Sequence, residues 1–411
     1  MKFYRVKTAE ETWSYISEQI KPISRTTNLP IDEALHRTLS NDIVAKEAVP
    51  SFSRSTVDGY AVRAKDTYGA SEMMPGFLSV TGEVKMGEEA TISLSAGEAI
   101  YVPTGAMIPE GSDAVVMIEY CEQTGDMLQV MRSAAPRENI IFRGEDVEDG
   151  EVLLQKGHKL RTQELGALAS LGVREVPVYE TPKIGYLSSG DEIVPYDQVT
   201  LNAGEIRDVN GLTIPQLAKQ AGFDCIYGGV APDDFSHYYE KAKQLLDHVD
   251  ILLLSGGSSV GEKDFTTRVI ESLGDGEASI DIHGISVKPG KPTIFGRADE
   301  KTIVGLPGHP ASAMVIYQMF VQPLLRRLSG QRVEPIRPSK VAKVSENIPS
   351  TPGRTDYIRV QLVEDEGELF AKPILGKSGL MKTLVKSDGL LEIDSKKEGV
   401  LKGDQVQVTL F

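Results

Sequence analysis

The chain is poor in cysteine and histidine, which limits the metal and redox chemistry available to it. Its 411 residues include two cysteines, Cys121 and Cys225, in separate apolar stretches. A lone pair of cysteines in a chain of intracellular character is typical of buried thiols rather than of a disulfide or a metal site. The six histidines show neither an HExxH motif nor close pairing, so the sequence does not predict a zinc site.

Long apolar runs and a surplus of basic residues are also missing. No segment approaches the roughly 20 apolar residues that a membrane span requires, and the first residues lack the basic and then apolar pattern of a secretory signal. We therefore expect a cytoplasmic protein that does not insert into a membrane. The formal net charge of −15 disfavours binding to nucleic acid or anionic membranes, because both depend on clustered Lys and Arg. An anionic ligand would need a local basic pocket or a divalent cation.

The chain does contain enough apolar sequence for several folded units. It has 411 residues, of which 40% are hydrophobic. A chain of this length usually folds into several domains, each with its own hydrophobic core, so two to four domains are expected. Residues 10–46 are expected to form a helix and a second amphipathic stretch. Residues 47–141 are expected to form short alternating strands such as Phe77–Val80 and Ala99–Val102. Val333–Phe411 returns to strands and turns, which predicts a small β sandwich or barrel.

Between residues 183 and 330, short apolar strands alternate with helical stretches. This alternation predicts a parallel sheet covered by helices on both faces. Asn210 and either Asp233 or Asp234 stand where helix N-caps are expected. The stretch 313–328 predicts one long helix.

Three loops of this α/β region carry candidate chemistry, because ligands of open parallel sheets bind beyond the carboxyl ends of the strands. Residues 188–192 (SSGDE) contain two adjacent carboxylates, which could hold a hydrated Mg²⁺ or form a solvated acidic turn. Residues 255–264 (SGGSSVGEKD) contain glycines that let backbone amides approach an anion, although an ordinary strand-to-helix turn also favours glycine. Residues 305–312 (GLPGHPAS) enter the next helix, with Ser312 in its first turn.

A pair of lysines lies between these loops. Lys288 and Lys291 stand three residues apart in the rigid, turn-prone segment VKPGKP of an otherwise acidic protein. Such a pair suits an oxyanion, although exposed lysines commonly serve only solubility. Taken alone, the polar breaks at 53–61, 102–106 and 143–146 are typical of turns.

The order and spacing of these segments resemble the MoeA family of molybdopterin molybdenumtransferases, which also includes the C-terminal domain of gephyrin. The resemblance covers nearly the whole chain. It rests on motifs that follow one another in the family's order: TVDGYAVRA, VPTGAMIPEGSDAVVMIE, RGEDVEDGEVLLQKG, LSSGDEIV, DVNG, LSGGSSVGEKDF, VKPGKP, GLPGHPASA and GRTDYIR.

The resemblance implies a multidomain fold with a central three-layer α/β molybdopterin-binding domain, flanking β domains and a C-terminal β barrel. The implied domains are a discontinuous elongated one (1–46 and 142–181), an inserted β domain (47–141), the α/β domain (182–330) and the barrel (331–411). It also implies a homodimer with its active site between protomers. Molybdopterin adenylyltransferase and molybdoenzymes are the protein partners that it suggests.

The function implied by the resemblance is insertion of molybdate into adenylylated molybdopterin, with release of AMP and help from Mg²⁺. The residues at the family's functional acidic positions are Asp58, Asp146, Glu192, Asp233 and Asp264. Among these, the candidates for holding Mg²⁺ are Glu192 and Asp264. The positions matched to the molybdopterin part of the substrate are Thr104, Gly256, Gly257, Ser259, Gly308 and Ser312. Those matched to molybdate are Lys288, Lys291, Pro292, Arg359 and Ser378.

Two other functions stay open on the sequence alone. The α/β region also resembles the molybdopterin adenylyltransferases, which make the adenylylated substrate and would consume ATP. The gephyrin version of this architecture also docks receptor peptides, so a scaffold protein is the second alternative. The acidic positions and the lysine pair favour the molybdenumtransferase, because a pure scaffold would not need them.

Overall fold

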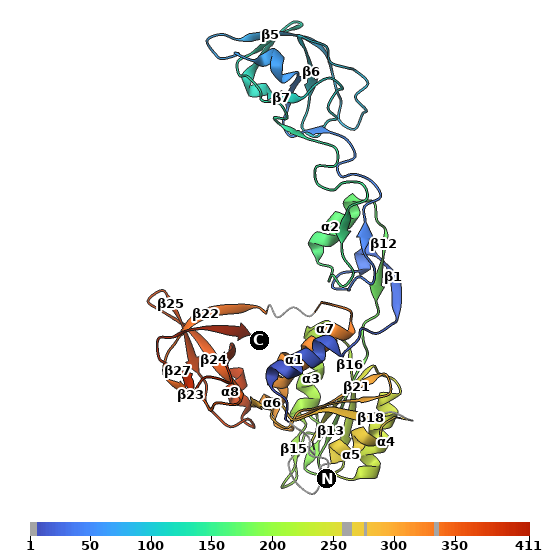
Figure 1. The fold of residues 1–411 in the computed structure, drawn as a ribbon, viewed down its shortest axis with the longest axis vertical. Helices are drawn as coiled ribbons and strands as arrows, with labels where there is room; N and C mark the ends of the chain where they lie inside the picture. Colours follow the sequence, from blue (N-terminus) through green and yellow to red (C-terminus); the bar gives the residue numbers. More distant parts are fainter. Residues whose placement is uncertain (1–5, 257–264, 275–277, 333–336) are drawn as a thin grey trace.

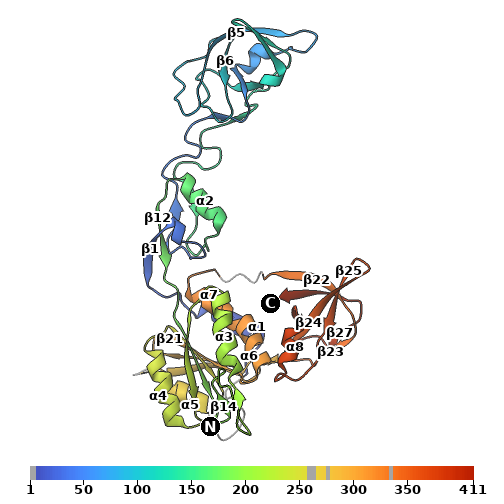
Figure 2. The same cartoon turned by 180° about the vertical axis from the view of Figure 1, so that it is seen from behind.

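The chain is described by a computed structural model that covers residues 6–256, 265–274, 278–332 and 337–411. Its shape is elongated. A β unit lies at one far end, a small unit lies in the middle, and an α/β unit and a barrel lie beside each other at the other end (Figure 1). The view from behind shows the same separation (Figure 2). No helix of the described ranges is long and apolar enough to cross a membrane.

The far unit is a six-stranded sheet with the order β7-β4-β6-β5-β9-β8. Its strands are β4 (Gly59–Val62), β5 (Gly76–Glu83), β6 (Glu98–Val102), β7 (Ala114–Met117), β8 (Cys121–Thr124) and β9 (Met127–Val130). The prediction of short strands in this part of the chain is confirmed. The sheet buries apolar side chains on both faces, since Tyr60 and Val62 belong to one core cluster and the intervening Ala61 to another.

The middle unit is assembled from two separate stretches of the chain. Strand β1 (Thr26–Pro30) pairs with β12 (Glu175–Tyr179), and β2 (Ile43–Val44) pairs with β11 (Val152–Leu154). The second amphipathic stretch predicted from the sequence therefore forms β structure and one 3₁₀ turn. Helix α2 (Thr162–Ser170) was not predicted, although it packs Leu168 into the core of this unit.

The α/β unit contains a six-stranded sheet with the order β16-β13-β17-β21-β20-β18. Its strands are β13 (Ile184–Ser189), β16 (Cys225–Ala231), β17 (Ile251–Ser255), β18 (Ala278–His283), β20 (Ile294–Ala298) and β21 (Lys301–Leu306). The first four in the sheet order run parallel, as predicted. The prediction of a wholly parallel sheet is wrong at β20, which runs opposite to the other strands and pairs antiparallel with both β21 and β18. The reason is a tight turn between Ala298 and Lys301, because so short a connection can only join antiparallel strands.

Helices cover both faces of this sheet and complete three layers. The helices are α1 (Ala9–Glu18), α3 (Val209–Gln220), α4 (Phe235–Leu246), α5 (Phe265–Ser272), α6 (Pro310–Ile316) and α7 (Gln322–Leu328). One core cluster joins α1, α3, α6 and α7 to the sheet, and the other joins α4 and α5 to it. The apolar face of each helix is thus buried against the strands, which fixes the loops at the strand ends.

Two expectations about helices need correction. Helix α3 is capped by Asp208, whose Oδ1 accepts a hydrogen bond from the Gly211 N–H at 2.8 Å, and Asn210 lies inside the first turn. The single long helix is divided into α6, a π turn and α7. Pro323 has no N–H to offer to the carbonyl of Met319 four residues earlier, so the regular helix cannot continue. Arg337 donates to that carbonyl instead, at 3.1 Å.

The C-terminal unit is a closed barrel in which five strands form a ring in the order β24-β25-β22-β28-β26 and back to β24. These strands are β22 (Ser339–Val344), β24 (Thr355–Asp365), β25 (Glu368–Pro373), β26 (Gly389–Ile393) and β28 (Gln405–Leu410). The barrel prediction is confirmed. A short strand of the preceding region, β19 (Val287–Lys288), pairs with the start of β24. The segment VKPGKP is therefore attached directly to the barrel.

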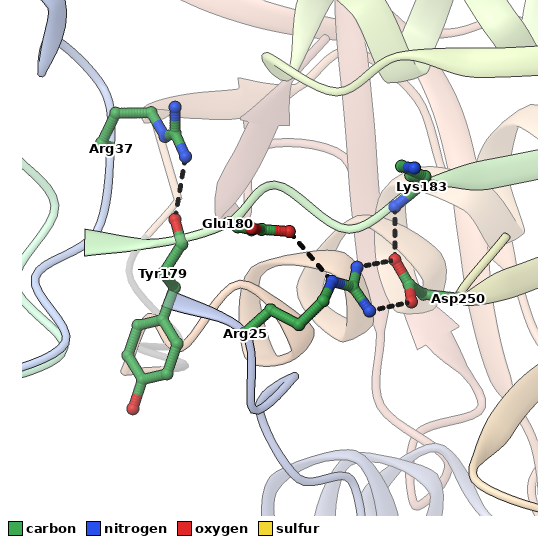
Figure 3. A network of polar contacts seen from close by, with 6 residues as sticks. All are labelled: Arg25, Arg37, Tyr179, Glu180, Lys183 and Asp250. Atoms are coloured by element: carbon green, nitrogen blue, oxygen red, sulfur yellow. Dashed lines mark hydrogen bonds and ion pairs between the residues drawn. The ribbon is translucent and has the colours of Figure 1, made fainter. Parts of the chain in front are cut away.

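A set of polar contacts holds the middle unit against the α/β unit (Figure 3). The guanidinium of Arg25 makes two hydrogen bonds with the carboxylate of Asp250, at 2.9 and 2.8 Å, and a third with Glu180 at 2.9 Å. The backbone N–H of Lys183 also donates to Asp250, at 2.8 Å. Burial alone would raise the pKa of Asp250, but the hydrogen bonds from Arg25 and Lys183 and the charge of Arg25 hold it below its ordinary value.

We expect Arg25→Met to lower the stability of the chain near neutral pH by no more than about 1 kcal/mol, because Arg25 is 44% exposed and solvent screens the pair. A depressed carboxyl pKa contributes stability above the ordinary value of about 3.9. The contribution disappears as pH falls through the lower pKa of folded Asp250. Thermal unfolding of Arg25→Met and the wild type across this range measures the difference. Arg174→Met, which alters an exposed arginine of the middle unit, should show no such dependence on pH.

Candidate functional site

The carboxyl ends of the four parallel strands form one edge of the α/β sheet. Strand β13 ends at Ser189, β16 at Ala231, β17 at Ser255 and β21 at Leu306. The N–H of Gly190 donates to the carbonyl of Ala231 at 3.1 Å, which joins the loop after β13 to the end of β16. All three loops singled out from the sequence begin at this edge, as ligand-binding loops of open parallel sheets do.

Asn210 connects two of these loops. Its side-chain Nδ2 donates to the carbonyl of Gly308 at 2.8 Å and to Ser255 Oγ at 3.2 Å. The residue is 5% exposed and lies in the first turn of α3. Asn210 therefore fixes the loop after β21 relative to the end of β17.

From the sequence, Asn210 was expected only as a possible helix cap, and Asp208 was not among the candidates. The carboxylate of Asp208 is buried and accepts the Tyr227 hydroxyl at 2.8 Å in addition to capping α3. Burial and this hydrogen bond raise the pKa of Tyr227. The motif DVNG was the available signal for both residues in the sequence, because Asp and Asn are preferred at helix starts. Their burial with hydrogen-bonded side chains is visible only in the structure.

Two buried polar atoms at this edge have no hydrogen-bond partner among the described residues. They are Asn210 Oδ1 and Ser189 Oγ, both on side chains that are less than a tenth exposed. Buried polar atoms are normally paired, so an unpaired acceptor and an unpaired hydroxyl indicate a ligand that supplies the missing partners. Gly256 lies next to them, with a φ of +110°, and a Cβ there would come within 2.2 Å of the Ser189 carbonyl oxygen. Only glycine fits this approach.

Two of the acidic candidates lie at this edge, where Glu192 is exposed and Asp233 is half-buried. The N–H of Asp233 donates to Asp191 Oδ1 at 2.9 Å, so the loops after β13 and β16 meet there. The carboxylate of Glu192 lies beside Gly190, where a Cβ would be 3.1 Å from Glu192 Oε2. The candidates Gly257, Ser259 and Asp264 lie outside the described residues.

Arg359 on β24 is the most deeply buried of the residues predicted to bind the oxyanion, and it is 8% exposed. Its guanidinium donates to Thr383 Oγ1 at 2.8 Å and to the Gly376 carbonyl at 3.0 Å. No carboxylate of the described residues pairs with it, and burial lowers its pKa. A buried guanidinium with neutral partners alone is suited to receive an anion.

The other oxyanion candidates gather around helix α6. The carbonyl of Ser378 accepts the N–H of Ala311 at 3.1 Å, so the barrel loop that contains Ser378 docks on the first turn of α6. Ser312 is buried in the same turn. His309 lies against this loop, since a Cβ on Gly379 would be 3.5 Å from its ring.

The segment with the two lysines packs on the same helix. A Cβ on Gly290 would be 2.3 Å from Ile316 Cδ1, so glycine is required where this segment crosses α6. Lys288, Lys291 and Pro292 are exposed beside that crossing. Lys288 is paired in register with Asp356, three residues before Arg359 on β24. The structure thus brings the lysine segment, the barrel loop and the start of α6 into one region.

Three candidates lie away from this region. The N–H of Thr104 donates to Asp58 Oδ1 at 2.6 Å, and its hydrogen bonds lower the pKa of that carboxyl. Both residues belong to the far β unit. Asp146 is exposed where this unit joins the middle unit, and its N–H donates to the carbonyl of Val49 at 3.1 Å. Figure 1 shows the far unit at the opposite end of the molecule from the α/β sheet, so one chain does not bring these residues to Asn210.

We expect Asn210→Ala to lower the free energy of unfolding by about 1 to 3 kcal/mol, because it leaves the Gly308 carbonyl without its donor in a buried site. It should also reduce ligand binding at this edge. Urea unfolding measures the first effect. Asn202→Ala is the matched control, since Asn202 is exposed and its side-chain amide bonds only to Glu205, and a change within about 0.5 kcal/mol is expected there. Equal effects of the two variants would contradict the role assigned to Asn210.

Together, the three-layer α/β sheet with a ligand edge, the far β unit and the barrel define a multidomain protein built around a small-molecule site. Three family models match successive parts of the chain. "MoeA N-terminal region (domain I and II)" matches residues 7–172, "Probable molybdopterin binding domain" matches 185–327, and "MoeA C-terminal region (domain IV)" matches 341–411. The chain belongs to the MoeA family.

Individual proteins match over the full length as well. The molybdopterin molybdenumtransferase of Haemophilus influenzae is 34% identical over 407 residues, which is 98% of this chain and 98% of that protein. The molybdopterin molybdenumtransferase of Bacillus subtilis is 32% identical over 387 residues, or 93% of this chain and 89% of that protein. The crystal structure of the molybdopterin biosynthesis MoeA protein of Pyrococcus horikoshii superposes with a TM-score of 0.83 at 33% identity, covering 99% of this chain and 100% of that one.

Proposed function

We propose that this protein is a molybdopterin molybdenumtransferase, which inserts molybdate into adenylylated molybdopterin and releases AMP. The near-complete match to proteins of that name supports the reaction. The match to a molybdopterin-binding family over residues 185–327 supports the α/β unit as the place where the pterin binds.

The observation that carries the proposal is the buried guanidinium of Arg359. It lies on the barrel, has no carboxylate partner among the described residues, and belongs to a region that also holds the exposed lysines of VKPGKP. Molybdate is a dianion, and a buried arginine with unused donors together with nearby ammonium groups is suited to such a charge. The residues proposed to hold molybdate are Lys288, Lys291, Pro292, Arg359 and Ser378.

The edge of the α/β sheet is proposed to hold the other substrate. Gly256 lets the backbone approach the ligand closely, and Asn210 Oδ1 and Ser189 Oγ offer an acceptor and a hydroxyl for a polar group such as a pterin ring. Gly308 and Ser312 at the start of α6 present backbone N–H groups that favour a phosphate. Gly257 and Ser259 complete this proposed set. Cleavage of the linkage between AMP and molybdopterin would occur where this edge meets the molybdate residues.

We propose Mg²⁺ as the metal that assists this cleavage. Glu192 offers a carboxylate at the sheet edge, which is the kind of hard oxygen donor that Mg²⁺ prefers, and Asp264 is the second proposed ligand. Within the described residues no group of three metal-binding side chains is gathered. Mg²⁺ usually keeps several bound waters and is held by one or two carboxylates together with substrate phosphates. Bound there, Mg²⁺ would neutralise the phosphate charge. Glu192 and Asp233 would keep the surrounding edge acidic enough to hold it.

We also propose that the active site forms between two copies of the chain. Asp58 directly precedes β4 and Thr104 follows β6 of the far β unit, and Asp146 lies where this unit joins the middle unit. Figure 1 shows the far unit remote from the α/β sheet of the same chain. If they act in the same reaction as Asn210 and Arg359, a second copy must bring them. The arrangement therefore favours a homodimer, the commonest symmetric assembly. Molybdopterin adenylyltransferase and molybdoenzymes, as supplier and recipients, are proposed as further contacts.

The purified protein should be mixed with adenylylated molybdopterin, Mg²⁺ and molybdate, with tungstate and without any oxyanion as controls. We expect AMP release that depends on molybdate and leaves metal on the pterin. Tight binding without AMP release would contradict the proposal in favour of a scaffold. Formation of the adenylylated pterin from ATP would instead indicate an adenylyltransferase.

A further inference from the structure

A basic groove lies where the middle unit meets the end of helix α7. Its volume is about 530 Å³. One wall is the segment between β11 and α2, which carries Lys156, Lys159 and Arg161, and the other wall carries Arg326 and Arg332. No carboxylate of the described residues lines the groove. In a chain with a formal net charge of −15, this concentration of cations is a local exception.

Two of the cations that line the groove are half-buried and have no carboxylate partner among the described residues. Lys159 and Arg326 are half-buried, and neither side chain makes a hydrogen bond or ion pair with the described residues. Burial lowers the pKa of both groups, and the positive charge of Arg326 lowers that of Lys159 further. Two like charges that repel each other in a partly desolvated site are unfavourable unless an anion joins them.

The cations around them are arranged differently. Arg161 is ion-paired with Glu164 at 2.5 Å and adds little free charge. Arg332 donates to the neutral side-chain oxygen of Gln155 at 2.8 Å, so its charge is not neutralised. Lys156 is exposed at the rim, with its ammonium 5.8 Å from the ring centre of Tyr179. The uncompensated charge is therefore centred on Lys159 and Arg326, with Lys156 and Arg332 beside them.

We propose that this groove is a second anion site, which binds a phosphate-bearing small molecule through Lys159 and Arg326. Arginine and lysine together recognise phosphate oxygens by charge-assisted hydrogen bonds. The groove is far larger than one oxyanion and falls within the roughly 300 to 1,000 Å³ of small-molecule sites, so the phosphate would belong to a larger molecule. The site is separate from the proposed molybdate residues, which lie on the barrel and around α6. A bound anion would bridge the middle unit and α7.

Isothermal titration calorimetry of the full chain with inorganic pyrophosphate at low ionic strength tests this site. Wild-type protein should bind pyrophosphate at the groove, and Arg326→Gln should weaken this binding by about tenfold or more, because one charged hydrogen-bond donor is lost. Lys159→Gln removes the other cation without altering α7 and should weaken it similarly. Lys397→Gln, an exposed lysine of the barrel, is the matched control and should bind as the wild type does. Separate titrations with inorganic phosphate and molybdate compare the two oxyanion classes.

Three results would overturn the site. Unchanged pyrophosphate binding in Arg326→Gln and Lys159→Gln would show that the groove is not used. Loss of binding only in Arg359→Met would place the ion at the proposed molybdate residues instead. A shift of the monomer–dimer equilibrium in Arg326→Gln, measured by light scattering, without any pyrophosphate binding by the wild type, would show that acidic side chains of a second copy occupy the groove. AMP release by Arg326→Gln should equal that of the wild type, which separates this site from the proposed reaction.

Discussion

Replacement of Arg359 by Met is expected to reduce AMP release that depends on molybdate by about a hundredfold or more. Among the residues proposed to bind molybdate, Arg359 is the one charged group that is buried, since Lys288 and Lys291 are exposed. The described hydrogen-bond partners of its guanidinium are neutral. Loss of one or two charge-assisted hydrogen bonds to a dianion costs about 1.5 to 3 kcal/mol each. Each 1.4 kcal/mol corresponds to about a factor of ten. Initial rates over a molybdate series at saturating adenylylated molybdopterin measure the effect.

Two companion variants separate recognition of the oxyanion from folding. Arg359→Lys keeps the charge but lacks the planar fork, so it should recover only part of the activity. Arg174→Met removes an exposed arginine of the middle unit and should behave as the wild type. We expect Arg359→Met to stay folded, because the cost of two lost hydrogen bonds is offset by removal of a buried charge that no carboxylate of the described ranges neutralises. A folded Arg359→Met protein with an unchanged response to molybdate would remove Arg359 from the site.

Short sequence patterns encode some features of this fold and leave others undetermined. The apolar runs of β13 and β17 and the turns around them were recognisable, because a buried parallel strand is a continuous apolar segment. The antiparallel strand β20 was not, since its direction depends on the turn that leads into β21 rather than on its own residues. The π turn between α6 and α7 likewise depends on Pro323 together with Arg337, which lies outside the helix.

The candidate site divides in the same way. Glycines such as Gly256 and Gly290 were visible in motifs, and the structure gives the reason for them, because any Cβ would collide with Ser189 or Ile316. The role of Asn210 was hidden, because its partners Ser255 and Gly308 are 45 and 98 residues away along the chain. That Arg359 pairs with no carboxylate of the described residues was hidden for the same reason. Motifs thus identify which residues are constrained, and only the fold shows which partners constrain them.

A mixed dimer of two inactive variants is expected to recover about half of the wild-type activity, if the site forms between two copies. The variants are Arg359→Met, which damages the barrel side of the site, and Asp58→Asn, which damages the far β unit. Asp58→Asn keeps an oxygen that can accept the Thr104 N–H and removes only the charge. In the mixed dimer, one site combines both defects, while the other combines an intact α/β and barrel side with an intact far unit. Each variant alone should be nearly inactive.

Co-expression with two different tags allows the mixed dimer to be isolated and assayed for AMP release. A mixed dimer of Arg359→Met and Asn210→Ala is the matched control, because both changes lie on the same side of the site and every site then carries one defect. Its activity should not exceed half of that of the Asn210→Ala homodimer, because the other site carries Arg359→Met. If the first mixed dimer is also inactive although both variants fold and associate, each chain must complete its own site, and the far unit would have to reach the α/β edge of the same chain. If Asp58→Asn alone is fully active, the far unit does not take part in the reaction, and the reason for proposing an intersubunit site disappears.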